Sequence, residues 1–257
     1  MQRRGEGESM NLCGLTDVGR QRANNQDTFR LMQLEETRGI FVVCDGMGGA
    51  QAGNVASDIA ASVFMEHMNR YIRPTMSGRY AESVLVNAIN FANYEVYKKS
   101  LSDASFKGMG TTLVGGFMQN GEVMLANVGD SRAYRCRKDE QGQIKIERIT
   151  RDHSVVEEMI LRGDLTEEEA RRHPRRNLIT RALGTEEHVK ADMYPVTMEP
   201  GEWLLLCSDG LTSMLDDKII AQILQNSDDL QTQTSALIAA ANEQGGSDNI
   251  TVMLVRV

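Results

Sequence analysis

Residues Phe41–Gly49 read FVVCDGMGG and predict a buried strand that ends at a carboxylate. The first four residues, FVVC, are strand formers with no polar interruption. Asp45 follows them directly, and three glycines within the next four positions let the backbone turn sharply away. We therefore expect the carboxylate of Asp45 to be held still, beside the unshielded carbonyl of Gly46.

An aspartate next to an apolar run recurs three times further along the chain. LANVGDSR places Asp130 after one such run, WLLLCSDGL places Asp209 after another, and GGSDNITVMLVRV places Asp248 before the last. Any one of them, taken alone, is most simply a turn or cap residue. Their repetition at strand ends instead predicts carboxylates collected at one edge of the sheets, where they repel one another unless a cation lies among them.

Length and charge limit the class of protein. The 257 residues, 41% of them hydrophobic, suit one large domain or two small ones, and the sequence shows no repeat or linker, which favours one. A net charge of −8 argues against a nucleic-acid partner, because such a partner requires a basic surface. No apolar run approaches the roughly 18 residues that span a bilayer, so no membrane association is expected.

The beginning of the chain and its cysteines indicate where the protein works. Residues 1–10 are polar and lack the apolar core of a signal peptide, so we expect a lead-in with Met10 as a candidate start, followed by one domain over residues 11–257. Cys44 and Cys207 lie in apolar runs, where a thiol acts as a small hydrophobe. Buried free thiols are typical of a reducing compartment, which predicts a cytoplasmic protein.

Helix and strand signals come in blocks. Apolar residues at four-residue spacing predict consecutive helices over 54–72 and 80–100. Four strands joined by short turns, and hence antiparallel, are expected between 108 and 150. Such blocks fit an α+β layered domain better than a βαβ winding. The remaining predicted elements are strands over 12–18, 29–34, 40–44, 193–196, 202–207 and 250–257, and helices over 215–224 and 230–242.

A charged stretch interrupts the strand pattern between residues 153 and 190, and its low apolar content predicts a surface flap over about residues 160–190. Within it, Thr166 and Glu169 form the pattern of a capping box for a short helix that His173-Pro174 ends. Its arginines either contact a phosphopeptide or form an ordinary solvated face. They are Arg171, Arg172, Arg175 and Arg176.

The aspartates at strand ends form a candidate metal shell. Hard oxygen ligands with no nearby Cys or His favour Mg²⁺ or Mn²⁺ over Zn²⁺. Several carboxylates on one rim can hold two ions about 4 Å apart, which together activate water and neutralise charge as that water attacks phosphorus. The candidate ligands are Asp27, Asp45, Asp130, Asp209 and Asp248.

Six segments occur along the chain in the order VGRQRANNQDTF, VVCDGMGG, GMGTT, ANVGDSRAYR, LCSDGLT and GGSDNITV. In these segments and their order, residues 11–257 resemble the metal-dependent Ser/Thr protein phosphatases of type 2C (the PPM family), in their compact bacterial form. The resemblance implies an αββα sandwich, in which two central antiparallel β-sheets are each covered by a helix pair. The blocks of strands and helices described above agree with it.

The resemblance also assigns roles to the aspartates. It implies that Asp45 bridges two metal ions, Mn²⁺ or Mg²⁺, and that the Gly46 carbonyl binds the second. Asp209 and Asp248 would bind the first ion, and Asp27 would act through a metal-bound water.

Further implied roles concern a third ion and the phosphate. Asp130, with Asp209, would hold a third, weaker ion. Arg22 matches the family's phosphate-binding arginine, and its planar fork suits two phosphate oxygens. Arg20 is the competing residue, with a solvated surface charge as its simpler interpretation. The residues assigned to catalysis are Arg22, Asp45 and Asp209.

Two positions depart from the common family pattern. Gln26 stands where many members have Glu, which predicts weaker metal binding. Met47 stands where eukaryotic members have a histidine thought to protonate the leaving group, so the general acid is unassigned and metal-bound water is the candidate. His153 is interpreted as structural, because a lone His is a poor indication of catalysis.

Residues beside these segments receive supporting roles. A packing role is expected for residues 110–112, which read Gly-Thr-Thr. Ser247 and Asn249 are expected to orient the loop of Asp248.

The resemblance implies a phosphatase that hydrolyses phosphoserine and phosphothreonine by metal-activated water. No covalent intermediate is expected, because the sequence contains no Cys-x5-Arg loop. The implied partners are phosphorylated Ser/Thr proteins, among them a cognate kinase, and the implied state is a monomer. Two alternatives remain: a catalytically silent relative that binds a phosphorylated partner as a scaffold, and a phosphatase for small phosphometabolites.

Overall fold

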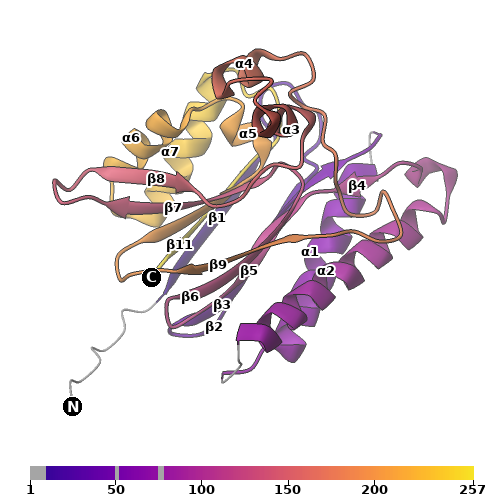
Figure 1. Cartoon of the computed structure of the whole chain (residues 1–257), viewed down its shortest axis with the longest axis horizontal. Helices are drawn as coiled ribbons and strands as arrows, with labels where there is room; N and C mark the ends of the chain where they lie inside the picture. The colour runs from indigo at the N-terminus through magenta and orange to yellow at the C-terminus, as the bar shows by residue number, and fades with distance from the viewer. Residues whose placement is uncertain (1–9, 50–51, 75–77) are drawn as a thin grey trace.

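The computed structural model describes residues 10–49, 52–74 and 78–257, which form two stacked antiparallel sheets (Figure 1). The first sheet has the strand order β2-β3-β5-β6-β9, with the short β4 paired to β3, and the second has the order β1-β11-β10-β7-β8. The strands are β1 (Asn11–Asp17), β2 (Asp27–Glu35), β3 (Arg38–Met47), β4 (Gly110–Thr111), β5 (Leu113–Gln119), β6 (Glu122–Val128), β7 (Arg132–Lys138), β8 (Ile144–Arg148), β9 (Asp192–Thr197), β10 (Trp203–Cys207) and β11 (Ile250–Arg256).

A pair of helices covers the outer face of each sheet (Figure 1). Helices α1 and α2 pack on the first sheet, and α6 and α7 pack on the second. None of the helices in the described ranges combines the length and apolarity needed to cross a bilayer. The helices are α1 (Ala52–Tyr71), α2 (Gly78–Ser100), η1 (Ala104–Phe106), α3 (Val155–Arg162), α4 (Glu167–Arg172), α5 (Asp209–Thr212), α6 (Asp217–Gln225) and α7 (Leu230–Glu243).

The strand that carries Asp45 is buried on both faces, as its apolar sequence predicts. Ile40 and Val42 pack under α1 and α2, whereas Phe41 and Val43 point into the core between the two sheets. Alternate residues of a strand face opposite sides of its sheet, so a strand in the middle of four layers needs apolar residues at every position. The predicted αββα sandwich is confirmed.

Most predicted elements are confirmed, with differences at their ends. The strand expected over 108–118 is two strands, β4 and β5, which both pair with β3 and are separated by Thr112. The helix expected over 215–224 begins at Asp217, where the Asp216 carboxylate accepts a hydrogen bond from the Ile219 N–H. The short helix α5 before it was not expected.

The polar lead-in predicted over residues 1–10 lies outside the described residues, except for Met10. Met10 ends that range and lies against the folded domain. Its side chain is 2% exposed and packs in the core between the sheets, and its N–H donates to the Glu36 carbonyl. Burial of this apolar side chain, just before β1, stabilises the folded domain.

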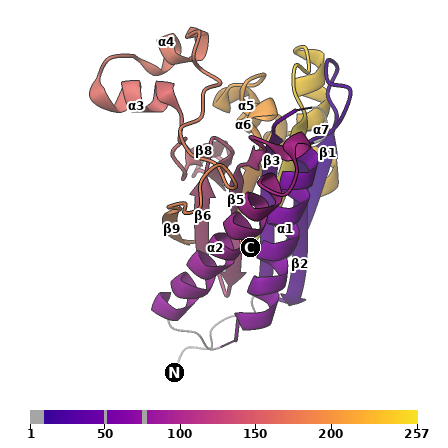
Figure 2. The ribbon, with the colours of Figure 1, turned by 90° about the vertical axis from the view of Figure 1, so that its right-hand side faces the viewer.

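The charged segment after β8 projects from the end of the sheets and contains α3 and α4 (Figure 2). The predicted capping box at α4 is confirmed. Oγ1 of Thr166 accepts from the Glu169 N–H, the Glu169 carboxylate accepts from the Thr166 N–H, and His173 is the C-cap. Helix α3 was not expected, and Ser154 caps it. Both helices lie at the end of the molecule where α5 begins (Figure 2).

Candidate metal centre

Strand pairing brings the predicted aspartates to one end of the two sheets. In the first sheet, Asp27 pairs directly with Asp45. In the second sheet, Cys207 pairs with both Arg132 and Val252, so Asp130, Asp209 and Asp248 all lie just beyond the same end of their strands. All five carboxylates expected at one edge are therefore close to one another, although up to 221 positions separate them in the sequence.

The electrostatics of Asp45 and Asp130 show that these carboxylates influence one another. Burial raises the pKa of Asp45 well above its usual range, and the charges of Asp27, Asp209, Asp130 and Asp248 raise it further. Burial likewise raises the pKa of Asp130, with Asp209 as the next contributor. Carboxylates in such surroundings take up protons unless a cation offsets their repulsion.

Asp27 is the most deeply buried member of the group, with 7% of its surface exposed. Its Oδ2 accepts hydrogen bonds from Ser208 Oγ at 2.6 Å and Thr251 Oγ1 at 2.7 Å. Burial raises its pKa to about 7; the two hydroxyls lower it, and the charges of Asp209 and Asp248 raise it. Its Oδ1 is buried without a hydrogen-bond partner among the described residues.

The donor set fits a divalent cation. Mn²⁺ and Mg²⁺ prefer carboxylate oxygens, and a bound cation would offset both the repulsion between the aspartates and the unpaired oxygen of Asp27. Asp209, at the start of α5, has its pKa raised to about 6 by burial and by Asp248. In residues 10–49, 52–74 and 78–257, no three His, Cys, Asp or Glu side chains already form a closed ligand group, so ion binding would have to draw the carboxylates together.

Two threonines hold the backbone of Asp45, a role that the sequence did not indicate. Thr112 Oγ1 accepts from the Asp45 N–H at 2.9 Å, and Thr111 Oγ1 donates to the Asp45 carbonyl at 2.9 Å. Thr112 Oγ1 also shares a hydrogen bond with Ser131 Oγ, next to Asp130. The expected packing role of these residues is thus extended, because their hydroxyls fix the position of a predicted ligand.

Gly46 lies where no side chain fits. A Cβ there would stand 2.0 Å from the Gly53 carbonyl oxygen, so only glycine allows the close approach of β3 to the start of α1. The Gly46 N–H donates to the Gln26 carbonyl at 3.1 Å, and the Gln26 side chain donates to the Gly49 carbonyl at 3.3 Å. The amide of Gln26 thereby supports the glycine turn that follows Asp45.

The loop that carries Arg22 is attached to Asp248 and its neighbour. Arg22 Nη2 donates to Asp248 Oδ2 at 2.7 Å. The Asn249 side chain accepts from the Gln26 N–H at 2.8 Å and donates to the carbonyls of Val18 and Asn24 at 2.9 and 3.0 Å. Asn249 is 5% exposed, so it joins the two ends of the chain beside the candidate site, consistent with its expected orienting role. Among the described residues, the Ser247 hydroxyl makes one contact, a long one of 3.9 Å to the Met214 sulfur.

His153 has the structural surroundings that were expected of it. Its ring is 7% exposed, and its Nδ1 accepts from the Gly129 N–H at 3.0 Å. Its Nε2 lies 3.2 Å from an oxygen of Asp192 and 3.0 Å from Arg181. Burial lowers the pKa of His153, which keeps the ring neutral so that Nδ1 can accept. The ring supports the turn before Asp130.

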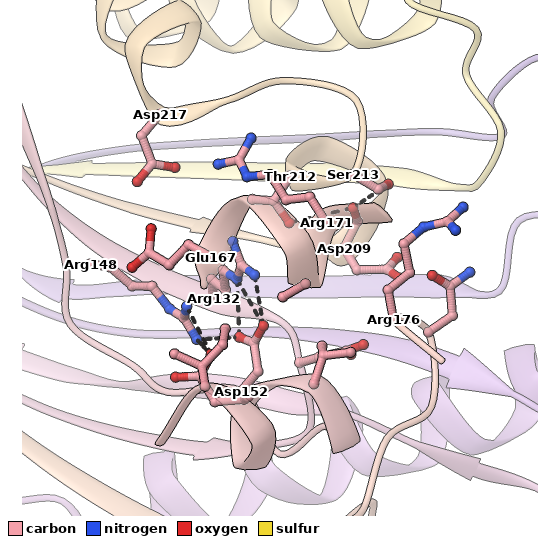
Figure 3. A pocket seen from close by; sticks show the side chains of 16 residues that line it. Arg132, Arg148, Asp152, Glu167, Arg171, Arg176, Asp209, Thr212, Ser213 and Asp217 are labelled. Atoms are coloured by element: carbon pink, nitrogen blue, oxygen red, sulfur yellow. Dashed lines mark hydrogen bonds and ion pairs between the residues drawn. The ribbon is translucent and has the colours of Figure 1, made fainter. Parts of the chain in front are cut away.

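A cavity of about 240 Å³ separates α3 and α4 from the carboxylates (Figure 3). Asp130, Asp209, Arg171 and Arg176 are all among the residues that line it. Arg172 points elsewhere and pairs with Glu168 at 3.4 Å. Two of the four arginines predicted in the flap therefore face the candidate site.

Comparison with known proteins identifies the relatives of this chain. Residues 18–254 match the family description "Protein phosphatase 2C". The serine/threonine phosphatase stp of Listeria innocua is 38% identical over 240 residues, 93% of each chain. The structure of the S. agalactiae serine/threonine phosphatase superposes with a TM-score of 0.86 at 36% identity, covering 96% of this chain and 99% of that one. The catalytic domain of the phosphatase PstP, described in complex with two manganese ions, gives a TM-score of 0.81 at 29% identity, covering 96% and 98% of the two chains. This chain therefore belongs to the protein phosphatase 2C (PPM) family.

Proposed function

We propose that this protein is a Ser/Thr protein phosphatase that hydrolyses phosphoserine and phosphothreonine with the help of two divalent ions, Mn²⁺ or Mg²⁺. The observation that carries this proposal is the gathering of Asp27, Asp45, Asp130 and Asp209 in a group whose burial and mutual charge raise their pKa values. The names of its relatives, serine/threonine phosphatases, support the substrate class.

Five carboxylates and one backbone carbonyl are the proposed metal-binding groups. Asp45 would contribute to both ions, the Gly46 carbonyl to the second, and Asp209 and Asp248 to the first. Bound ions would supply Lewis acidity, which activates water and neutralises phosphate charge. Asp27, which Ser208 and Thr251 fix in place, would act through a water bound to one of the ions. Asp130, with Asp209, would contribute to a third, weaker site.

Arg22 is the proposed phosphate-binding residue. Its guanidinium is held beside Asp248 and remains 52% exposed, so a phosphate that enters can use the remaining N–H groups. A planar guanidinium donates to two phosphate oxygens at once, which orients the phosphorus. Asp45, fixed by Thr111 and Thr112, would stay in place while the phosphate binds.

The domain organisation, oligomeric state, location and partners of the protein are also part of the proposal. We infer that residues 11–257 form one catalytic domain with a flap over about residues 160–190, and that it acts as a monomer, because a single chain supplies all the carboxylates. The described thiols, including buried Cys44, Cys136 and Cys207, are free, which supports a reducing, cytoplasmic location. Phosphorylated proteins, including a cognate Ser/Thr kinase, would be the partners.

Hydrolysis measured with and without metal tests this function. The protein should release phosphate from p-nitrophenyl phosphate and from a phosphothreonine peptide with Mn²⁺, and excess EDTA should abolish both reactions. Equal rates before and after chelation would refute the proposal. A panel of small phosphometabolites at the same Mn²⁺ concentration distinguishes a protein phosphatase from an enzyme for small substrates.

A further inference from the structure

A partly buried ion pair lies beside the candidate metal centre, and the proposed function does not use it. Arg132 donates to Asp152 through Nε at 3.0 Å and through Nη2 at 2.7 Å, and its Nη1 donates to the Tyr134 hydroxyl at 3.2 Å. Arg148 reaches the same carboxylate at 2.8 Å (Figure 3). It also pairs with Glu157 of α3 at 3.3 Å. Each guanidinium nitrogen of Arg132 therefore has an acceptor other than the candidate metal ligands.

The pairing of β7 with β10 places this guanidinium next to two candidate ligands. Arg132 begins β7, two residues after Asp130, and it pairs with Cys207, two residues before Asp209. Arg132, Asp152, Asp130 and Asp209 all line the same cavity. The positive charge of Arg132 lowers the pKa of both Asp130 and Asp209, and the negative charge of Asp152 raises it, so both charges reach the site.

We propose that Asp152 is a positioning residue of the metal centre, which holds and neutralises Arg132 so that this guanidinium does not occupy the oxygens that bind metal. An arginine that loses its buried partner must find another acceptor, because an unpaired charge out of water is costly. The carboxylates of Asp130 and Asp209 line the same cavity. Without Asp152, the guanidinium turns to them and competes with the divalent ions. This inference rests on the proposed function, which places the ions there.

Calorimetric titration of the chelator-treated full chain with Mn²⁺ tests the inference. Asp152→Asn should weaken Mn²⁺ binding about tenfold or more, through competition and uncompensated positive charge. Arg132→Gln removes the competitor and should bind Mn²⁺ at least as tightly as the wild type. The double variant Arg132→Gln/Asp152→Asn should return to within about threefold of the wild type, because the two effects cancel.

A second ion pair, whose arginine also lies on β7, is a matched control. Arg135 donates to Glu202 at 2.9 and 2.8 Å, and the side chains are 23% and 10% exposed, against 22% and 7% for Arg132 and Asp152. Arg135 pairs with Leu204, near the far end of β10 from Asp209. Glu202→Gln should lower the melting temperature as Asp152→Asn does, but it should leave Mn²⁺ affinity unchanged.

The outcomes separate this inference from the proposed function. Wild-type protein that takes up no Mn²⁺ would overturn the metal centre itself. Wild-type binding with unchanged affinity in Asp152→Asn would overturn the inference alone. If Asp152→Asn does not fold, Arg132→Gln decides, because weaker Mn²⁺ binding in that variant would mean that the guanidinium supports the carboxylates rather than competes for them.

Discussion

Arg22 Nη2 lies 2.7 Å from Asp248 Oδ2, which joins a residue of the loop before β2 to one just before the last strand. The two side chains are 52% and 30% exposed, and ion pairs this open to water add little to stability. The contact instead fixes the position of the guanidinium before phosphate binds. It stays beside the carboxylates, and its other donors, which have no partner among the described residues, are open to a phosphate that enters from solvent.

Replacing Arg22 should affect substrate binding more than folding. Arg22→Ala should raise KM for p-nitrophenyl phosphate about tenfold or more, because hydrogen bonds between charged groups are worth roughly 1.5–3 kcal/mol. The change in kcat should be smaller, and the melting temperature should stay the same. Steady-state kinetics at saturating Mn²⁺ measure this, with Arg20→Ala as the matched control. An unchanged KM in Arg22→Ala would place phosphate binding elsewhere.

Asp209 should be needed for metal binding and turnover and not for folding. Burial and Asp248 raise its pKa to about 6, so its ionised form is unfavourable in the metal-free protein. Asp209→Ala should therefore melt in EDTA at the wild-type temperature or above it, with no measurable phosphate release and weakened Mn²⁺ uptake. Circular dichroism and calorimetry on one preparation check both statements. Activity retained in the folded variant would contradict the role.

The sequence predicts the positions of four of the five aspartates well, because each of these four lies next to an apolar run that must be a buried strand. Asp45 follows FVVC, and Asp209 follows an equally apolar run, so strand ends could be located without knowledge of their neighbours. The strand order that brings those ends together within each sheet comes from the structure.

The groups that hold the aspartates could not be predicted in the same way. The hydroxyls of Thr111 and Thr112 contact Asp45 across 66 and 67 positions, and no local pattern marks such a contact. Met10 is surrounded in the sequence by polar residues and glycines, so the sequence indicates a polar segment. Its burial depends on the core between the two sheets, which the local sequence does not reveal. Side-chain contacts between distant segments therefore had to come from the structure.

The carboxylate of Asp27 should make the metal-free protein less stable as the pH rises. Its pKa is raised from 3.8 to about 7, so between these values the folded chain holds a proton that the unfolded chain has lost. Stability then falls with rising pH, by up to about 1.4 kcal/mol per pH unit. Asp27→Asn is neutral at every pH, and its amide oxygen can still accept from Ser208 and Thr251.

Thermal melts in EDTA at pH 5 and pH 8 measure this effect of Asp27. The melting temperature of Asp27→Asn, relative to that of the wild type, should be higher at pH 8 than at pH 5. A difference that is the same at both pH values would mean that Asp27 titrates at its ordinary pKa. Asp58→Asn, at an exposed ion pair with Arg30, is the control and should show no such trend.

Thr112 should be needed to keep Asp45 in place. Thr112→Val preserves the shape of the side chain but removes the acceptor for the Asp45 N–H and the partner of Ser131 Oγ. An unsatisfied buried donor costs about 1–3 kcal/mol, so the melting temperature should fall. Because the strand that carries Asp45 also loses its fixed position, kcat should fall and the Mn²⁺ concentration for half-maximal activity should rise. Thr197→Val, whose hydroxyl pairs with exposed Glu122, should change neither quantity. A stable Thr112→Val with wild-type metal dependence would show that β3 alone holds Asp45.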